Sequence, residues 1–261
     1  MARAPSKPPY TLLARYYDRL IVEHPKLFQR ARRRLLGKIL PQVRSVCELA
    51  CGTGTTALEF ARRGLRVFAV DDSSAMCRLT QQKARRARLP VQVLRADMRS
   101  FRLPQPVDLV TCEFDAINHV PRKADLGRVA RAVARALRPG GYFYFDVNTQ
   151  RAFKEIWPRS WYIETPKFVL ASHGGYDRRR RKGRSQFEWF LPEGKQWRRA
   201  TETYQQVCWT HAEIRRALRR AGFDRVRAWD SHKVIPGPVW IRPGCRTFYL
   251  AQKSRDPTRK M

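Results

Sequence analysis

Short apolar runs alternate with longer amphipathic segments over residues 44–148 of the chain. The apolar runs have the length and composition of buried strands and lie at residues 44–49, 64–70, 91–94, 107–112 and 142–148. Apolar positions at helical spacing mark the segments between them, at residues 55–63, 73–88 and 122–138. Strands that alternate with helices in this way predict a parallel sheet with helices on both faces.

The pattern differs at both ends of this alternating region. Two amphipathic helices are expected ahead of the first strand, at residues 10–20 and 25–40. From residue 149 the segments alternate in polarity and carry many aromatic residues, at 168–172, 185–191 and 197–209, which predicts an antiparallel β insertion. Thr210 and Glu213 form a capping box that opens a helix to Arg220, and two final strands are expected at 224–229 and 247–251.

Composition narrows the class of protein. A chain of 261 residues with 43% hydrophobic content is long enough for one large domain with a full core and an insertion. No run of about 18 apolar residues occurs, and the start of the chain lacks an apolar signal core. The six cysteines include no Cys-x-x-Cys pair and no nearby histidines at zinc spacing. We therefore expect a cytoplasmic protein with reduced cysteines, no membrane contact and no metal site.

The formal net charge of +32 is the most unusual bulk property. It is compatible with a polyanionic partner such as RNA. Only 12 of the 54 basic residues are lysine, however, and the arginines are spread over nearly every predicted helix. Dispersal of this kind indicates a drift in composition rather than a binding groove, so nucleic acid is a possible partner but not the favoured one.

The strand at 44–49 runs directly into a turn with two glycines. Gly52 and Gly54 supply the backbone freedom that a tight strand-to-helix turn needs, and they let a ligand approach the helix amides. The next strand ends in Asp71, about 20 residues past the glycines, where a carboxylate can accept both hydroxyls of a ribose. This order of elements predicts half of a nucleoside-cofactor site.

Three motifs together resemble class I S-adenosylmethionine-dependent methyltransferases: residues 48–54 (ELACGTG), 69–76 (AVDDSSAM) and 96–98 (ADM). A dinucleotide enzyme would prefer Gly-x-Gly-x-x-Gly, and no third glycine follows here. The resemblance, which is best over residues 10–150, implies S-adenosyl-L-methionine as cofactor, with S-adenosyl-L-homocysteine as product. It implies cofactor contacts at Glu48, Ala50, Cys51, Gly52, Gly54, Asp71, Asp72, Met76, Ala96, Asp97, Met98, Glu113 and Phe114.

The loop at residues 113–120 follows a central strand, where open α/β sheets place their chemistry. Its Ile-x-His ending is similar to that of amino-sugar N,N-dimethyltransferases, in which the histidine is taken as the base. Because a histidine titrates near neutrality, His119 suits proton removal from the acceptor, with Asp115 as the second catalytic candidate. The alternatives stay open that His119 caps the next helix or packs in the wall, and that a deprotonated amine needs no base.

Candidate substrate contacts come from three segments. The resemblance implies that a Tyr-Asp pair in the N-terminal helix covers the cofactor, which leaves Tyr16 or Tyr17 beside Asp18. Asn118 and Asn148 follow predicted strands and are further candidates. The insertion carries several tryptophans, which either line a substrate pocket or form the core of a small sheet.

We expect a Rossmann-like, doubly wound sheet of seven strands, the last one antiparallel, with a small antiparallel β insertion. The expected segments are a disordered basic start (1–9), the cofactor-binding core with N-terminal lid helices (10–148), the insertion over the active site (149–209), the rest of the core (210–252) and a basic tail (253–261). The predicted activity is methyl transfer to a small molecule, an amine first and a hydroxyl second, by a monomer or homodimer. Two alternatives remain: an RNA or protein methyltransferase, and a cofactor-binding module without chemistry.

Overall fold

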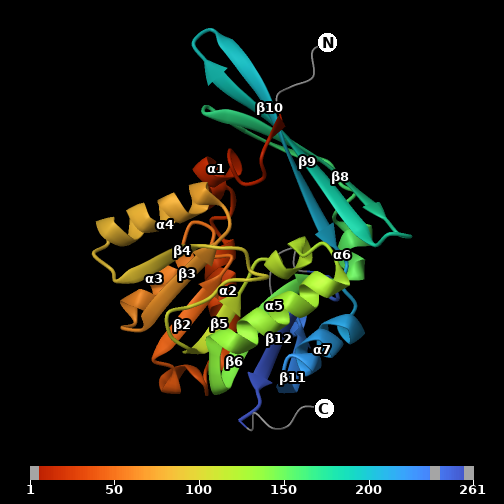
Figure 1. Ribbon diagram of the computed structural model, residues 1–261. Helices are drawn as coiled ribbons and strands as arrows, with labels where there is room; N and C mark the ends of the chain where they lie inside the picture. The colour runs from red at the N-terminus through yellow and green to blue at the C-terminus, as the bar shows by residue number, and fades with distance from the viewer. Residues whose placement is uncertain (1–5, 236–241, 256–261) are drawn as a thin grey trace.

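The computed structural model describes residues 6–235 and 242–255. Its described part holds two sheets (Figure 1). The first has seven strands in the order β11-β12-β6-β5-β2-β3-β4, with bounds β2 Ser45–Leu49, β3 Arg66–Asp71, β4 Val91–Arg95, β5 Val107–Cys112, β6 Leu137–Asn148, β11 Phe223–Asp230 and β12 Arg246–Lys253. β12 runs antiparallel to both of its neighbours, β11 and β6, whereas β6, β5, β2, β3 and β4 are parallel to one another, which confirms the predicted fold class.

Helices cover both faces of this core sheet. Successive side chains of a strand point to opposite faces. Val46 of β2 therefore packs with Phe28 of α2 (His24–Leu36) and Phe60 of α3 (Thr55–Arg62). Cys47 instead belongs to the cluster that contains α5 (Lys123–Ala136) and α7 (His211–Arg220). The remaining helical elements are α1 Leu13–Leu20, η1 Leu40–Gln42, α4 Ser74–Arg86, η2 Ala116–His119, α6 Gln150–Glu155 and α8 Ser231–Val234.

The second sheet is the predicted insertion. It has five strands in the order β1-β10-β9-β8-β7, with bounds β1 Ser6–Lys7, β7 Trp161–Thr165, β8 Phe168–Asp177, β9 Lys182–Glu193 and β10 Gln196–Val207. In Figure 1 it stands above the core sheet, with α1 at the junction between them. A core of its own, built around Trp189 and Phe168, also takes in Leu12 and Leu13 from the start of the chain. The insertion is thus held to the core through the N-terminal segment.

The expected boundaries of the N-terminal and C-terminal segments are wrong. Ser6–Lys7, expected in a disordered start, pair in parallel with β10, because an open sheet edge offers unpaired backbone groups to any neighbouring segment. Lys253, placed in the tail, is the last residue of β12, and its ammonium donates to two carbonyl oxygens. The turn expected at Pro139–Gly141 is present as an irregularity inside β6, where the pairing with β5 shifts register, Gly140 has a φ of +78° and Gly141 leaves room beside the Asp108 carbonyl oxygen. The loop expected at 236–238 lies outside the described residues.

Candidate active site

A cavity of about 640 Å³ lies at the carboxyl ends of β2, β3, β4 and β5. The segment 8–11 and α1 border it on the side of the second sheet. Fourteen of the residues proposed from the sequence line it: Tyr17, Glu48, Ala50, Cys51, Gly52, Asp71, Asp72, Met76, Ala96, Asp97, Met98, Glu113, Phe114 and His119. Gly54, Asp115, Tyr16, Asn118 and Asn148 do not line this cavity.

The glycine turn and the acid at the end of β3 form one unit. The Gly52 amide donates to Asp71 Oδ2 at 2.9 Å, and the Ser73 amide donates to Oδ1 at 2.8 Å. Burial raises the pKa of Asp71, while the two amide hydrogen bonds act against that rise. Each carboxylate oxygen keeps a further lone pair for a ligand hydroxyl. The backbone thus fixes Asp71 where the second strand meets the cavity.

Gly54 shapes the turn instead of lining the cavity. Its φ of +79° is left-handed, and a Cβ there would lie 2.5 Å from the Thr80 side chain. Gly54 is also the N-cap of α3, so no side chain caps this helix. Its role is to let α3 and α4 approach each other closely.

Two buried acids lie at the closed end of the cavity. Glu113 is paired with the buried Arg32, and Arg32 also contacts Glu59. Burial raises the pKa of Glu113 to about 7 and raises that of Glu48 well above its usual value. Glu48 Oε2 and Glu113 Oε1 are buried and have no hydrogen-bond partner in the described part of the chain. Glu48 and Glu113 thus place two carboxyl groups with raised pKa values at the cavity wall.

Asp97 lies at the other end of the cavity, after β4. Both of its carboxylate oxygens accept hydrogen bonds from the Arg99 side chain, and these hold the pKa of Asp97 below its usual value. Any ligand contact with Asp97 must therefore share its oxygens with Arg99. The neighbours Ala96 and Met98 complete this rim.

α1 covers the cavity through Tyr17 and not through Tyr16. A Cβ placed on Gly52 would lie 3.9 Å from the Tyr17 ring, and the adjacent Asp18 accepts from the Thr53 hydroxyl at 2.5 Å. Tyr16 instead packs in the second sheet, its ring 5.4 Å from that of Trp189. Consecutive helical residues point about 100° apart, so only one tyrosine of the pair can face the cavity. The Tyr16 candidate is therefore wrong as a cavity contact.

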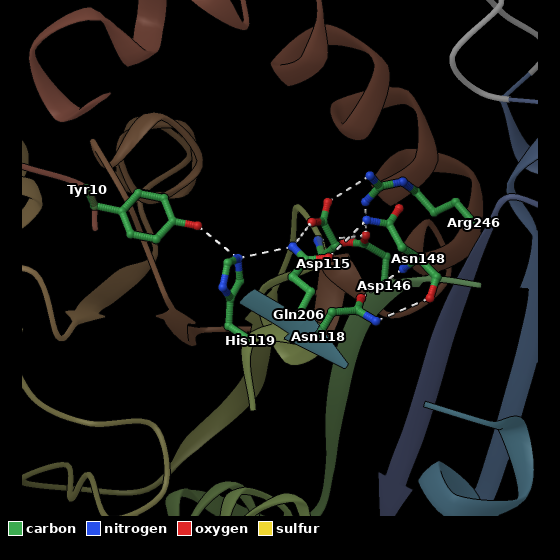
Figure 2. Close-up of polar contacts among 8 residues, drawn as sticks. All are labelled: Tyr10, Asp115, Asn118, His119, Asp146, Asn148, Gln206 and Arg246. Atoms are coloured by element: carbon green, nitrogen blue, oxygen red, sulfur yellow. Dashed lines mark hydrogen bonds and ion pairs between the residues drawn. The ribbon is translucent and has the colours of Figure 1, made fainter. Parts of the chain in front are cut away.

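His119 and Asp115 belong to one polar cluster (Figure 2). The Tyr10 hydroxyl lies 2.9 Å from His119 Nε2, and the Gln206 side-chain nitrogen lies 3.1 Å from the same atom. Gln206 also donates to Asp115 Oδ2 at 2.5 Å, and Arg246 donates to Asp115 Oδ1 at 2.8 Å. Burial lowers the pKa of His119, so the ring is neutral at neutral pH. Gln206 links Asp115 to the histidine by hydrogen bonds, and Asp115 itself does not line the cavity.

Asn118 and Asn148 form a structural pair. Asn118 is fully buried, its Nδ2 donates to the Val207 carbonyl at 2.8 Å, and its Oδ1 accepts from the Asn148 amide at 2.9 Å. With its donors and acceptor satisfied, Asn118 links β6 to β10 and has no group left for a substrate. Asn148 contacts Gln206 at 3.4 Å. Neither of these two substrate-contact candidates lines the cavity.

Other residues at the site were not among the candidates that the sequence suggested. Tyr10, Gln206 and Arg246 come from the N-terminal segment, the insertion and the last strand, far apart along the chain. Asp146 could have been recognised from the sequence, because it is an acid inside an otherwise apolar strand. It is fully buried and paired with Arg246. None of the insertion tryptophans lines the cavity, and Trp189 forms the core of the second sheet.

Glu202 is the most heavily bonded of the residues that sequence reasoning missed. It is fully buried on β10 and accepts from the amides of Thr11, Leu12 and Leu13 at 2.7 to 3.0 Å. The Trp189 and Tyr204 side chains donate to the same carboxylate. A carboxylate at a helix N-terminus satisfies free amides and complements the helix dipole. Glu202 thus fixes the start of α1, and with it the placing of Tyr10 and Tyr17.

Neither a metal cluster nor a membrane span is found in the described ranges. No three histidine, cysteine or acidic side chains gather there in a metal-binding group. No helix in those ranges has the length and apolarity to cross a membrane. All six cysteines are buried free thiols.

Comparisons with known proteins agree with this geometry. Residues 46–141 match the family model described as a methyltransferase domain. YqeM of Bacillus subtilis (strain 168), whose naming as a methyltransferase is provisional, is 28% identical over 223 residues, 83% of this chain and 87% of that protein. The dTDP-4-amino-2,3,4,6-tetradeoxy-D-glucose N,N-dimethyltransferase of Saccharopolyspora spinosa is 32% identical over 39% of each chain.

A solved structure extends the likeness to the whole fold. The S-adenosylmethionine-dependent methyltransferase of Clostridium acetobutylicum ATCC 824 superposes with a TM-score of 0.78 at 20% identity, over 94% of this chain and 99% of that one. The matched domain spans the glycine turn, Asp71, Asp97 and the His119 loop. Fold, motif order and domain match together support a class I S-adenosylmethionine-dependent methyltransferase.

Proposed function

We propose that the protein transfers the methyl group of S-adenosylmethionine to a small molecule, with an amine as the first acceptor class and a hydroxyl as the second. The observation that carries this proposal is that one cavity is lined both by Asp71 and by the neutral His119. When bound, the cofactor supplies an already activated methyl group. The residues of the chain are left to align the acceptor and to accept its proton.

The chemistry of the cavity fits this cofactor. The carboxyl groups of Glu48 and Glu113 suit the ammonium of its methionine part. Asp71 suits the ribose hydroxyls, and the bare backbone at Gly52 allows close approach. We assign the nucleobase end to Asp72, Met76, Ala96, Asp97 and Met98. Ala50, Cys51 and Phe114 complete the walls.

Apolar and aromatic side chains form a large share of the cavity wall. Tyr10, Tyr17, Ile21, Phe114 and Val120 are among them. Walls of this kind favour a compact, weakly charged acceptor over a polyanion. The relative that dimethylates an amino sugar supports an amine acceptor. We place the reaction in the cytoplasm because all six cysteines are free thiols.

A second candidate function keeps the methyl transfer but uses an RNA or protein acceptor. The net charge of +32 favours it, since such a surface attracts polyanions. A methyl-transfer assay that offers RNA, peptides and amino sugars as acceptors distinguishes it from the first candidate function. We set aside the third hypothesis, a cofactor-binding module without chemistry, because the family assignment indicates an enzyme.

The first experiment is calorimetric titration with S-adenosylmethionine and S-adenosylhomocysteine. Asp71→Ala should weaken binding by about 10- to 100-fold, because it removes one or two hydrogen bonds to a charged group. Asp224→Ala, which removes an exposed acid, should leave the affinity unchanged. Absence of binding to the unaltered protein would contradict the proposal.

The acceptor screen then uses mass spectrometry to detect added methyl groups. Its panel holds TDP-linked 4-amino sugars, phenols, peptides with a free amino terminus and bulk RNA. Methylation of an amino sugar that His119→Asn reduces by at least about 100-fold would support a base role for His119. Methylation of RNA or peptide alone would replace the first candidate function with the second.

A further inference from the structure

Gln206 reaches from the second sheet into the polar cluster around His119 (Figure 2). Its side-chain nitrogen contacts two atoms, Asp115 Oδ2 at 2.5 Å and His119 Nε2 at 3.1 Å. Asp115 is paired with Arg246 and accepts one amide hydrogen from Gln206. The second hydrogen of the same amide therefore points at His119 Nε2.

This contact decides which nitrogen of His119 carries the proton. A ring nitrogen that faces an N–H donor must present its lone pair. His119 is also hydrogen bonded to the backbone of Gln205, and this bond favours retention of a ring proton. The neutral ring therefore holds its proton on Nδ1 and its lone pair on Nε2. Adjacent residues of β10 thus fix both sides of the imidazole, one through its backbone and one through its side chain.

Tyr10 contacts this lone pair and, like His119, lines the cavity. Its hydroxyl is 2.9 Å from Nε2, and Tyr10 lines the cavity whereas the buried Gln206 does not. Its ring packs edge to face against Tyr204 at 5.1 Å. Burial raises the pKa of Tyr10, so the phenol keeps its proton and donates it to Nε2.

We propose that Gln206 is a positioning residue that holds His119 as the Nδ1–H tautomer, and that Tyr10 passes the acceptor's proton to Nε2. The inference rests on the proposed function of His119 as base. As the acceptor's N–H or O–H bond breaks, its proton goes to the Tyr10 oxygen while the phenol proton goes to Nε2. Tyr10 ends neutral, and the imidazole ends as the cation.

The positioning role is tested by NMR on the ¹⁵N-labelled protein, where long-range ¹H–¹⁵N correlations identify the tautomer and pKa of each of the five histidines. The His119→Asn variant assigns the signal. We expect the Nδ1–H form in the unaltered protein. Gln206→Met removes the donor that opposes protonation of Nε2, so an Nε2–H population should appear and the pKa of His119 should rise. Gln205→Met, which alters an exposed side chain and keeps the backbone bond, should change neither.

A second variant, Gln206→Glu, tests the same role if Gln206→Met misfolds. Gln206→Glu offers an acceptor to Nε2 and should drive His119 to the Nε2–H form. An Nε2–H ring in the unaltered protein, or an unchanged tautomer and pKa in both Gln206 variants, would overturn the positioning role. This readout needs no acceptor, so it is independent of whether the proposed function holds.

The proton path is tested with Tyr10→Phe. Loss of the hydroxyl donor should raise the pKa of His119 in the same titration. With a TDP-linked 4-amino sugar as probe, kcat should fall by about 100-fold while KM for S-adenosylmethionine stays within about twofold. Tyr162→Phe, an exposed tyrosine of β7, is the matched control. An unshifted pKa, or an unchanged kcat, would remove Tyr10 from the path, whereas a probe that the unaltered protein does not methylate counts against the proposed function.

Discussion

At the scale of single residues, burial sets the protonation of the acids around the cavity. Glu113 has the buried Arg32 beside it, yet its pKa is raised to about 7 from 4.5 because desolvation outweighs the attraction. Asp146 follows the same rule with a pKa raised to about 6 beside Arg246. The two acid–arginine pairs are therefore sensitive to pH near neutrality.

This raised pKa predicts an unusual dependence of stability on pH. The folded state binds the Glu113 proton more tightly than the unfolded state, so this stabilisation is complete below pH 4.5 and is lost as pH rises through about 7. The shift sets an upper limit of roughly 3 kcal/mol on the loss. Between pH 5 and 8 the free energy of unfolding should fall by at least about 1 kcal/mol more in the unaltered protein than in Glu113→Gln.

Urea denaturation at the two pH values measures this difference. Glu193→Gln, which changes an exposed acid, should keep the pH dependence of the unaltered protein. Equal pH dependence in the unaltered protein and Glu113→Gln would show that Glu113 titrates normally in the folded state.

At the scale of elements, the contact between β10 and α1 joins the second sheet to the cavity. Glu202 accepts three amides from the start of α1, and Asp18 anchors the same helix to Thr53 and Lys83 in the core. Tyr10 and Tyr17 come from this segment, and both line the cavity. The insertion thus acts on the site by holding the N-terminal cover, and its tryptophans have no direct contact with the cavity.

Glu202→Gln should loosen this cover. An amide in place of the carboxylate turns one acceptor into a donor that faces backbone N–H groups, at a cost of about 1.5–3 kcal/mol. Hydrogen exchange of the amides of residues 11–21 should speed up, and S-adenosylmethionine should bind more weakly. The matched control is Glu188→Gln on β9, whose carboxylate bonds only side chains. Unchanged exchange in Glu202→Gln would mean that α1 is held by its apolar contacts alone.

At the scale of the whole molecule, the positive charge is spread over the outer faces of the helices. Exposed arginines lie on α2, α4, α5 and α7, while Glu48 and Glu113 of the site are buried. A dispersed surface charge attracts polyanions without selecting a sequence, and salt screens it. The cavity, by contrast, combines acids and apolar groups with only three arginines among the described residues, Arg78, Arg95 and Arg99.

Binding of polyuridylate and of S-adenosylmethionine should therefore respond differently to salt. Between 50 and 200 mM salt the RNA affinity should fall by at least about 100-fold, and the cofactor affinity by less than about twofold. Fluorescence anisotropy and calorimetry measure the two. An RNA affinity that resists salt would indicate a specific RNA site and favour the second candidate function.

The sequence by itself determined the core sheet and the cofactor end of the site. Periodicity and turn residues are local properties, so β5 and α7 were predicted to the residue or nearly so. The acids at strand ends were also predictable, because carboxyl ends of parallel strands meet at one edge. Asp71, Asp97 and His119 meet there for that reason.

Only the tertiary structure decided which candidates face the cavity and what controls the histidine. Tyr16 and Tyr17 differ by one step around a helix, and only packing against the second sheet separates their roles. Tyr10, Gln206 and Arg246 are 40 to 236 residues apart from each other in the chain, and no local pattern links them. Their meeting at His119 and Asp115 depends on how the insertion docks, because long-range contacts are set by the packing of whole elements.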